Sequence, residues 1–485
     1  MCGIVGIVSS SPVNQSVYDS LSLLQHRGQD STGIATSEGS TLHMFKAKGQ
    51  VREAYRTRDM RTLLGTMGLG HVRYATRGDA DKEQEAQPFY VNAPYGIVLV
   101  HNGNLTNTRE LTDALFRTDR RHLNTSSDTE LLVNVLANEL QSQIRGADLD
   151  PDQVFDAIEV LHERVEGSYA AIALIAGQGL LAFRDPFGIR PLILGRRSDG
   201  LVGAEWVVAS ESLVLEAGGY EVVRDVAPGE AIFITEQGEL YSRQCAKNPR
   251  LIPCSFEYVY LARPDSIMNG ISVYDARLRL GDRLADTIAK YTPSGAIDVI
   301  MPIPDSARPA AMQVARKLGI EYREGFYKNR YVGRTFIMPG QEQRTKSVKQ
   351  KLNAMSSEFK GKNVLIVDDS IVRGTTSKEI VDMARIAGAN SVTFTSAAPP
   401  VRFPHVYGIN MPTRAELIAA GRKIPEIATA LGADHLIYQE VEDMKSAILE
   451  GSDITELEMS CFTGDYVTGT VTPEYLEWVE RTQLS

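Results

Sequence analysis

The chain has 485 residues, of which 43% are hydrophobic and 23% charged, and its formal net charge is −10 at pH 7. This length and composition are typical of a globular protein with two or three domains, and two large domains are the simplest arrangement. The absence of a membrane-length apolar run and of a signal-peptide pattern predicts a cytoplasmic protein with no membrane contact. The acidic balance argues against a nucleic acid as partner.

The first half of the chain, to about residue 240, predicts short strands with turns and a few helices, which is an α+β pattern. Residues 127–130 resemble a capping box and open a run of apolar residues at helical spacing, which predicts a helix. Apolar runs of strand length lie at residues 3–9, 96–101, 169–175 and 180–184.

The second half, from about Phe256, alternates apolar strands with amphipathic helices, which predicts an α/β domain with a mainly parallel sheet and sites at the carboxyl ends of its strands. The predicted strands are 298–301, 363–367 and 391–397, and the predicted helices are 307–318 and 376–387. A segment with two prolines, residues 244–253, separates the halves. We therefore expect domains over 2–243 and 254–470, followed by a helical tail over 471–485.

Cys2 directly follows the initiator methionine. Removal of Met1 would leave one residue that carries both a thiol and a free α-amine, whose pKa of about 8 lets it accept the thiol proton. Gly3 lets the backbone approach a substrate closely, and the apolar run behind it holds the terminus in a strand. Cys2 is therefore a candidate nucleophile, and the alternative is an inert residue.

The other three cysteines, Cys245, Cys254 and Cys461, form no C-x-x-C pair with one another or with Cys2. Their spacing therefore gives no support for a zinc or redox site, and a reducing compartment makes disulfides unfavourable. We expect these three to be small buried apolar residues.

Five short motifs of the first half resemble, in the same order, those of the N-terminal-nucleophile glutamine amidotransferases. They are residues 1–7, 25–30, 71–76, 101–104 and 126–128. The resemblance implies a glutaminase domain built as a layered αββα sandwich, which cleaves glutamine through a thioester on Cys2.

The residue types of these motifs suit that reaction. Asn102 and the Gly103 amide can form an oxyanion hole, the Arg73 guanidinium can hold the substrate carboxylate, and Asp128 can hold its ammonium group. A plain helix N-cap is the alternative for Asp128. We expect three further residues to shape the glutamine pocket, Tyr74, Thr76 and His101. Packing is the alternative for Tyr74 and His101.

A second strong motif lies at residues 364–377. It begins with four apolar residues, and two adjacent carboxylates, Asp368 and Asp369, follow them. Paired carboxylates suit a ribose diol, and the amides of the loop and helix N-terminus that follow suit a phosphate. A turn with surface acids is the alternative. The motif resembles the phosphoribosyl pyrophosphate (PRPP) signature of type I phosphoribosyltransferases, which implies PRPP contacts from Asp368, Asp369, Ser370, Arg373, Gly374, Thr375 and Thr376.

Two further segments resemble parts of such enzymes. Residues 302–308 resemble the pyrophosphate loop, with Asp305 and Ser306 as the expected contacts. Residues 328–351 hold seven Lys or Arg and one acid, which is either a solvated loop or a lid that closes on a polyanion. As a lid, its expected PRPP contacts are Tyr331, Arg334 and Lys351. One Mg²⁺ per subunit is expected with PRPP, beside Ser306, Asp368 and Asp369.

The order of glutaminase, linker and PRPP motif resembles that of the glutamine PRPP amidotransferases over nearly the whole chain. This implies a glycosyltransferase that makes 5-phosphoribosylamine from PRPP and glutamine, the first committed step of purine synthesis. It also implies a homotetramer, an internal ammonia passage and feedback inhibition by purine nucleotides. Some members carry an iron–sulfur cluster on four cysteines and a cleaved propeptide. Here Cys254, Cys461, His405 and Glu458 fall at the cluster positions, so we expect no iron–sulfur cluster, and no propeptide before Cys2.

Two alternatives remain at this point. Other N-terminal-nucleophile amidotransferases, such as asparagine synthetase or glucosamine-6-phosphate synthase, share only the first half, and residues 364–377 speak against them. A PRPP-sensing regulatory protein would bind PRPP without catalysis. The acidic charge and the intact Cys2 motif speak against that class.

Overall fold

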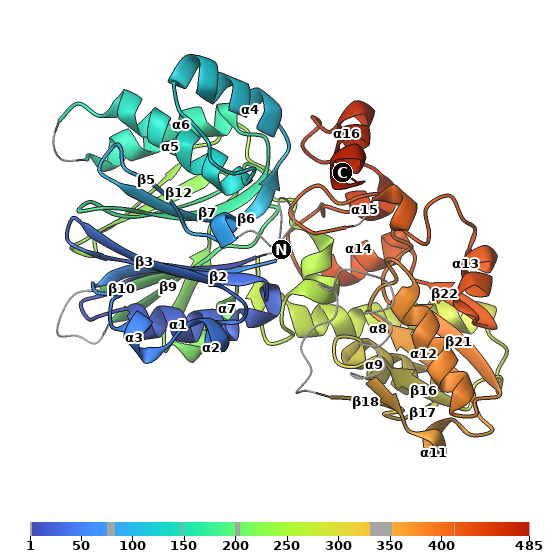
Figure 1. Cartoon of the computed structure of the whole chain (residues 1–485). Coiled ribbons are helices and arrows are strands. Elements are labelled where there is room, and N and C mark those ends of the chain that lie inside the picture. The colour runs from blue at the N-terminus through green and yellow to red at the C-terminus, as the bar shows by residue number, and fades with distance from the viewer. Residues whose placement is uncertain are drawn as a thin grey trace.

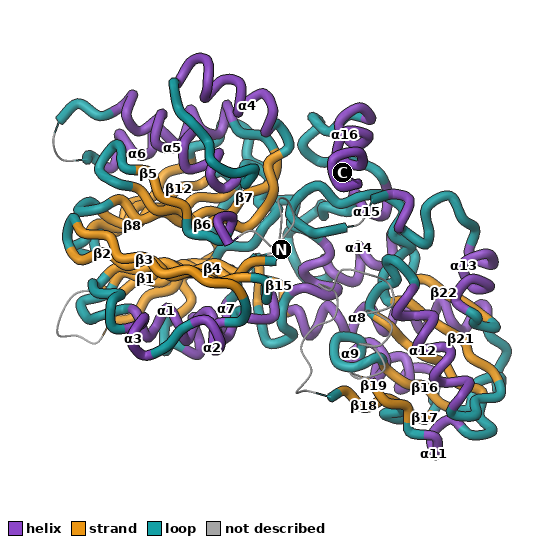
Figure 2. Tube along the Cα trace, viewed as in Figure 1, coloured by secondary structure: helices purple, strands orange, loops and turns teal. Residues whose placement is uncertain are grey.

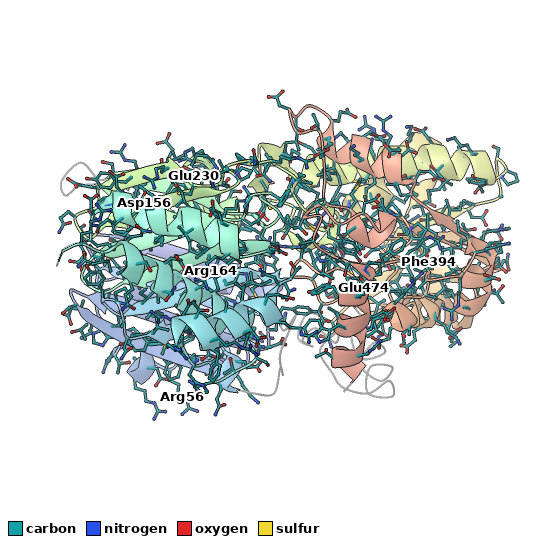
Figure 3. All side chains as sticks on the ribbon, turned by 90° about the horizontal axis from the view of Figure 1, so that it is seen from above. Arg56, Asp156, Arg164, Glu230, Phe394 and Glu474 are labelled. Atoms are coloured by element: carbon teal, nitrogen blue, oxygen red, sulfur yellow. The ribbon has the colours of Figure 1, made fainter. Side chains whose placement is uncertain are left out.

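The structure is a computed structural model that describes residues 2–74, 83–146, 149–198, 204–329, 352–411 and 413–484. It consists of an N-terminal lobe, elements β1 to β13, and a C-terminal lobe, elements η4 to α16 (Figure 1). Seen from above, the lobes lie side by side, with Arg164 in the first and Phe394 in the second (Figure 3).

The N-terminal lobe contains two antiparallel sheets. The first has seven strands, in the order β11 (Glu221–Asp225), β9 (Ile193–Ser198), β10 (Ala204–Ala209), β1 (Gly3–Val8), β4 (Met67–Arg73), β2 (Ser31–Glu38) and β3 (Thr41–Lys48). The second has six strands, in the order β13 (Leu240–Gln244), β12 (Glu230–Thr235), β8 (Gly179–Arg184), β7 (Gly167–Ile175), β6 (Ile97–Leu105) and β5 (Phe89–Val91).

The two sheets pack face to face, and helices cover their outer faces (Figure 2). Apolar side chains of both sheets, among them Ile4, Leu69, Val100 and Ile172, form one buried cluster between them. The helical segments are α1 (Asn14–Leu23), η1 (Gln25–Arg27), α2 (Val51–Ala54), α3 (Thr57–Met60), η2 (Glu83–Glu85), α4 (Thr108–Ala114), η3 (Leu115–Asp119), α5 (Asp128–Gln143), α6 (Pro151–Arg164) and α7 (Ser212–Ala217). The predicted αββα sandwich is confirmed.

The C-terminal lobe is built on a parallel sheet of five strands, as predicted. Its order is β17 (Glu321–Tyr322), β16 (Val299–Pro302), β20 (Asn363–Asp368), β21 (Ser391–Ser396) and β22 (His435–Tyr438). Two short hairpins accompany it, β14 (Ile267–Met268) with β15 (Ile271–Ser272), and β18 (Phe326–Lys328) with β19 (Leu352–Ala354).

Buried apolar clusters lie on both faces of this sheet, because β16 and β20 point alternate side chains to opposite sides. The helical segments are η4 (Glu257–Leu261), α8 (Val273–Tyr291), α9 (Arg308–Leu318), α11 (Ser356–Phe359), α12 (Thr375–Ile386), η5 (Arg414–Glu416), α13 (Ile424–Leu431), α14 (Val441–Leu449), α15 (Ser460–Thr463) and α16 (Pro473–Leu484). Within the described parts of the chain, no helix is long and apolar enough to cross a membrane.

Candidate active sites

Cys2 directly precedes β1 and is buried, and the N-terminus lies between the two lobes (Figure 1). Its main-chain nitrogen donates a hydrogen bond to Asn102 Oδ1 at 3.1 Å. Its Sγ lies 3.7 Å from the main-chain oxygen of Tyr74. The predicted nucleophile therefore contacts β6 of the second sheet and the end of β4 in the first.

Asn102 carries the strongest sign of a catalytic site. Its side chain is fully buried, its Oδ1 is bonded to Cys2, and its Nδ2 has no hydrogen-bond partner within the described residues. An unsatisfied buried donor costs about 1–3 kcal/mol, so its presence beside a thiol indicates a place kept for a ligand oxygen. Gly103 follows it with φ of +152°, and an added Cβ would lie 2.0 Å from the Ser168 oxygen. Only glycine fits there.

Arg73 and Asp128, the two residues predicted to hold glutamine, are both mostly buried. Arg73 Nη2 donates to Glu85 Oε2 at 3.0 Å, so part of the guanidinium is already paired. Asp128 Oδ2 accepts from the Leu105 amide at 3.2 Å. Ser127 is the N-cap of α5, and Asp128 is the first helical residue, so the alternative of a plain N-cap for Asp128 is wrong.

The other predicted glutamine-pocket residues differ in their placement. His101 is buried: its Nδ1 lies 3.4 Å from Thr129 Oγ1 and its Nε2 3.4 Å from the Ser168 oxygen. Burial lowers the pKa of His101, so the ring is neutral and packs between β6, β7 and α5. Tyr74 is half-buried and packs against a cluster of buried apolar side chains that belong mostly to the C-terminal lobe. Thr76 lies outside the described residues.

Asp368 and Asp369 stand at the end of β20, as predicted, and both are at least nine-tenths buried. Ser306 Oγ donates to Asp369 Oδ2, and Ser370 Oγ donates to Asp369 Oδ1 at 2.7 Å. Burial, and then the charge of Asp369, raise the pKa of Asp368 well above its ordinary value, and burial also raises the pKa of Asp369. Two crowded carboxylates of this kind suit a hard cation or sugar hydroxyls, so this group fits Mg²⁺.

The predicted pyrophosphate loop lies beside these carboxylates, because β16 and β20 are parallel neighbours. Asp305 is exposed, accepts from Lys328 Nζ at 2.6 Å and pairs with Arg308 Nη1 at 3.0 Å. Arg308 and Lys328 are candidate anion contacts that were not among the predicted site residues, although Lys328 begins the predicted lid segment. Arg308 stood in the quoted motif, and its positive charge next to Asp305 was the available signal.

The loop after Asp369 leads directly into α12. Gly374 is the N-cap of this helix, Thr375 and Thr376 are its first residues, and amides at a helix start suit a phosphate. Arg373 Nη2 lies 3.9 Å from Glu416 Oε2, and its buried Nε has no partner among the residues that the structure describes. The predicted lid contacts Tyr331, Arg334 and Lys351 lie outside those residues.

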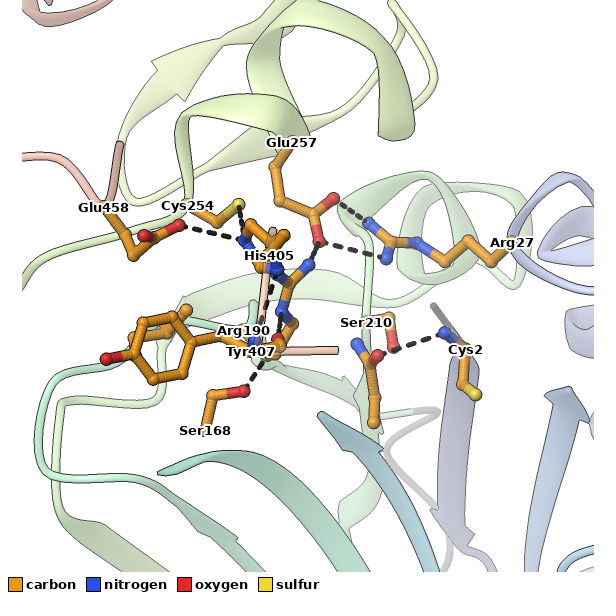
Figure 4. A network of polar contacts seen from close by, with 12 residues as sticks. Cys2, Arg27, Ser168, Arg190, Ser210, Cys254, Glu257, His405, Tyr407 and Glu458 are labelled. Carbon is orange, nitrogen blue, oxygen red and sulfur yellow. Dashed lines mark hydrogen bonds and ion pairs between the residues drawn. The ribbon is translucent and has the colours of Figure 1, made fainter. Parts of the chain in front are cut away.

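Cys254, His405 and Glu458 form a buried group whose candidate ligand atoms lie within 4.8 Å of one another. His405 Nδ1 accepts from the Tyr407 amide at 3.2 Å, and burial lowers the His405 pKa, so the neutral ring carries its proton on Nε2. Nε2 then donates to Glu458 Oε2 at 3.0 Å (Figure 4) and has no lone pair for a metal.

Iron–sulfur clusters are held mainly by four thiolates, whereas the four positions that correspond to cluster ligands, Cys254, His405, Glu458 and Cys461, offer two thiols. Burial raises the pKa of Cys254 to about 12 and that of Cys461 well above its ordinary value, so both thiols are neutral in the metal-free protein. These residues do not fit an iron–sulfur cluster. Cys254 is buried in an apolar cluster, as predicted, and its Sγ also contacts His405 Nε2 at 3.6 Å.

A stability prediction follows from the crowded carboxylates. A raised folded-state pKa contributes stability below the unfolded pKa of about 4, and that contribution is lost as the pH rises through the folded value. Asp368→Asn should therefore raise the melting temperature of the ligand-free protein at pH 7.5 by roughly 2–4 °C. Scanning calorimetry measures it, and the gain should shrink towards pH 4. A lower melting temperature, or a gain independent of pH, would contradict the electrostatic account.

Comparison with known families matches both lobes. Residues 71–217 match the glutamine amidotransferase domain model, and residues 272–399 match the phosphoribosyl transferase domain model. The fold and the two sites thus define a glutamine amidotransferase fused to a phosphoribosyltransferase, which is the predicted architecture.

Whole-length relatives narrow this class further. The amidophosphoribosyltransferase of Pseudomonas aeruginosa is 53% identical over 482 residues, which covers 99% of this chain and 96% of the relative. That of Escherichia coli is 54% identical over 482 residues, covering 99% and 95%, and that of Saccharomyces cerevisiae is 47% identical over 492 residues, covering 100% and 96%. The chain belongs to the amidophosphoribosyltransferase family.

Two solved structures agree. The glutamine PRPP amidotransferase of B. subtilis, complexed with ADP and GMP, is 36% identical with a TM-score of 0.83, over 96% of this chain and 97% of that one. A structure described as the allosteric regulatory enzyme of purine biosynthesis is 36% identical with a TM-score of 0.86, over 99% of both chains. The chain is thus an enzyme, a glutamine amidotransferase and pentosyltransferase of the first step of purine synthesis, and the main prediction of function is confirmed.

Proposed function

We propose that this enzyme cleaves glutamine at Cys2 in a domain over residues 2–243, and passes the ammonia to PRPP in a domain over residues 254–470. The observation that carries the proposal is Asn102, whose Oδ1 is bonded to the Cys2 nitrogen and whose Nδ2 is a buried donor with no partner in the described structure. A turnover assay with PRPP, glutamine and Mg²⁺ tests it. Formation of 5-phosphoribosylamine, glutamate and pyrophosphate in equal amounts is expected, and glutamate release alone would contradict it.

In the glutaminase step, loss of Met1 converts the Cys2 nitrogen into an α-amine, which accepts the thiol proton. The thiolate attacks the amide carbon of glutamine, and the oxyanion accepts hydrogen bonds from Asn102 Nδ2 and the Gly103 amide. The leaving ammonia takes the proton from the amine, a thioester remains on Cys2, and water hydrolyses it to glutamate. Arg73 and Asp128 hold the substrate carboxylate and ammonium, with Glu85 keeping the Arg73 guanidinium in place. Tyr74, Thr76 and His101 complete the pocket wall.

In the transfer step, Asp368 and Asp369 accept the ribose hydroxyls, and the loop from Ser370 to Thr376 binds the 5-phosphate. Asp305 positions Lys328 and Arg308 for the pyrophosphate group. Tyr331, Arg334 and Lys351 close over the substrate. Ammonia then forms a bond to C1 with inversion while the bond to pyrophosphate breaks, a step that requires positioning and charge stabilisation more than a protein base.

Ser306, Asp368 and Asp369 would hold one Mg²⁺ per subunit, because their oxygens lie together at the strand ends. The bound cation would neutralise charge on the departing pyrophosphate.

Family membership supports a further proposal on assembly and regulation. We propose a cytoplasmic homotetramer with an internal ammonia passage and feedback inhibition by purine nucleotides. The B. subtilis relative complexed with ADP and GMP supports nucleotide binding.

The oxyanion role of Asn102 gives a separate prediction. Asn102→Ala should lower kcat for glutamine hydrolysis by about 10²–10³-fold, because one donor to the oxyanion is lost. Synthesis with added ammonium should stay within about two-fold of wild type. Steady-state assays with each nitrogen source measure both values. An unchanged glutaminase kcat would remove Asn102 from the oxyanion hole.

A further inference from the structure

Residues 404–409 of the C-terminal lobe, here called the interlobe segment, contact the strands that carry the proposed oxyanion hole. Asn104 Nδ2 on β6 donates to the Val406 oxygen at 2.8 Å. The Tyr407 oxygen accepts two hydrogen bonds at 2.8 Å, from Ser168 Oγ on β7 and from Arg190 Nε (Figure 4). All three donors come from the N-terminal lobe, so the interlobe segment is bonded to the glutaminase half along its main chain.

The C-terminal lobe fixes the same segment from the other side. His405 accepts the Tyr407 amide at Nδ1 and donates to Glu458 from Nε2. Tyr466 OH donates to the Pro404 oxygen at 2.8 Å. The Cys254, His405 and Glu458 group therefore acts as an anchor that sets the backbone of the interlobe segment.

Gly408 brings this backbone into direct contact with Gly103. Its φ is +97°, and a Cβ at this position would lie 2.7 Å from the carbonyl carbon of Gly103 and 2.8 Å from its Cα and oxygen. A methyl group this close to main-chain atoms is not tolerated without a shift of one backbone. Gly103 itself is closely packed, because a Cβ on it would lie 2.0 Å from the Ser168 oxygen.

We propose that Gly408, held by the His405 anchor, is a positioning residue for glutamine cleavage: the C-terminal lobe sets the orientation of the Gly103 amide. The inference rests on the proposed oxyanion role of Asn102 and Gly103. Oxyanion stabilisation depends on donors placed to within a few tenths of an ångström, and misplacement by about 1 Å can cost 10²-fold. A main-chain contact from the C-terminal lobe thereby positions one proposed oxyanion donor of the glutaminase site.

Gly408→Ala in the full-length protein tests this. The glutaminase kcat should fall about 10–100-fold, while KM for glutamine stays within about two-fold, because Arg73 and Asp128 are not displaced. Ammonium-dependent synthesis and the rate of Cys2 alkylation by iodoacetamide should stay within about two-fold, since neither uses the oxyanion hole. A general disturbance of the lobe junction would change these two rates as well, and that outcome would overturn the inference.

Gly451→Ala is the matched control, since Gly451 has a similar φ of +81° but open space around its Cβ position. It should leave all four values unchanged. If Gly408→Ala does not fold, Ser168→Ala removes one bond to Tyr407 and should lower the glutaminase kcat about three-fold with KM unchanged.

A folded Gly408→Ala protein with wild-type glutaminase kcat would overturn the inference, as would an unchanged kcat in Ser168→Ala where that variant has to be used. Asn102→Ala distinguishes the failures. If the kcat of Asn102→Ala falls and that of Gly408→Ala does not, the oxyanion role of Asn102 is supported and the positioning role of Gly408 is rejected. If Asn102→Ala keeps the wild-type kcat, the proposed oxyanion role of Asn102 is itself rejected.

Discussion

Cys2→Ala is expected to abolish 5-phosphoribosylamine formation from glutamine, by at least about 10⁴-fold, because it removes the only nucleophile that the thioester route provides. Synthesis from PRPP and added ammonium should persist within about two-fold of wild type, since the second site lies in the other lobe. Parallel assays of product formation with glutamine and with ammonium measure the two values on one preparation.

Cys245→Ala is the matched control, because Cys245 is also a buried thiol of the N-terminal lobe, whose pKa burial raises to about 11. It should keep both activities. Loss of both activities together in Cys2→Ala would contradict the division of labour between the lobes.

The double substitution Asp368→Ala and Asp369→Ala is expected to have the opposite effect, which is loss of synthesis while glutamine hydrolysis remains. Synthesis should fall by about 10³-fold or more with either nitrogen source, because the buried carboxylates position the ribose and the cation that neutralises pyrophosphate. Basal glutamine hydrolysis at Cys2 should remain measurable. The assays use PRPP at saturating Mg²⁺, with pyrophosphate release as the readout.

A second pair of adjacent acids supplies the control for this experiment. Glu442 and Asp443 lie in the first turn of α14, in the same lobe but not at a strand end. Alanine at both positions should leave synthesis unchanged. If the Asp368 and Asp369 double variant still makes product from ammonium at the wild-type rate, the PRPP site lies elsewhere.

Local motifs predicted the elements that carry chemistry. The apolar run after Cys2 is β1, the run before Asp368 is β20, and both expected helices beside the PRPP motifs are present as α9 and α12. These segments were predictable because strand and helix periodicity is local, and because turn and cap residues mark their ends.

Contacts between the lobes were not predictable in this way. Asn104 and Val406 are 302 residues apart, and nothing in either local pattern indicates that they pair. Gly408 shows no signal beyond being a glycine, because its φ and its neighbour depend on the packing of both lobes. The proton position on His405 is likewise set by a backbone amide whose direction only the fold defines.

The most direct test of the two-site account is mass spectrometry of the fully active enzyme after treatment with 6-diazo-5-oxonorleucine, an electrophilic glutamine analogue. We predict that Met1 is absent, that a single adduct forms on the Cys2 thiol in step with the loss of glutamine-dependent synthesis, and that ammonium-dependent synthesis survives. A fully active chain that retains Met1, or inactivation with the adduct on another residue, would contradict it.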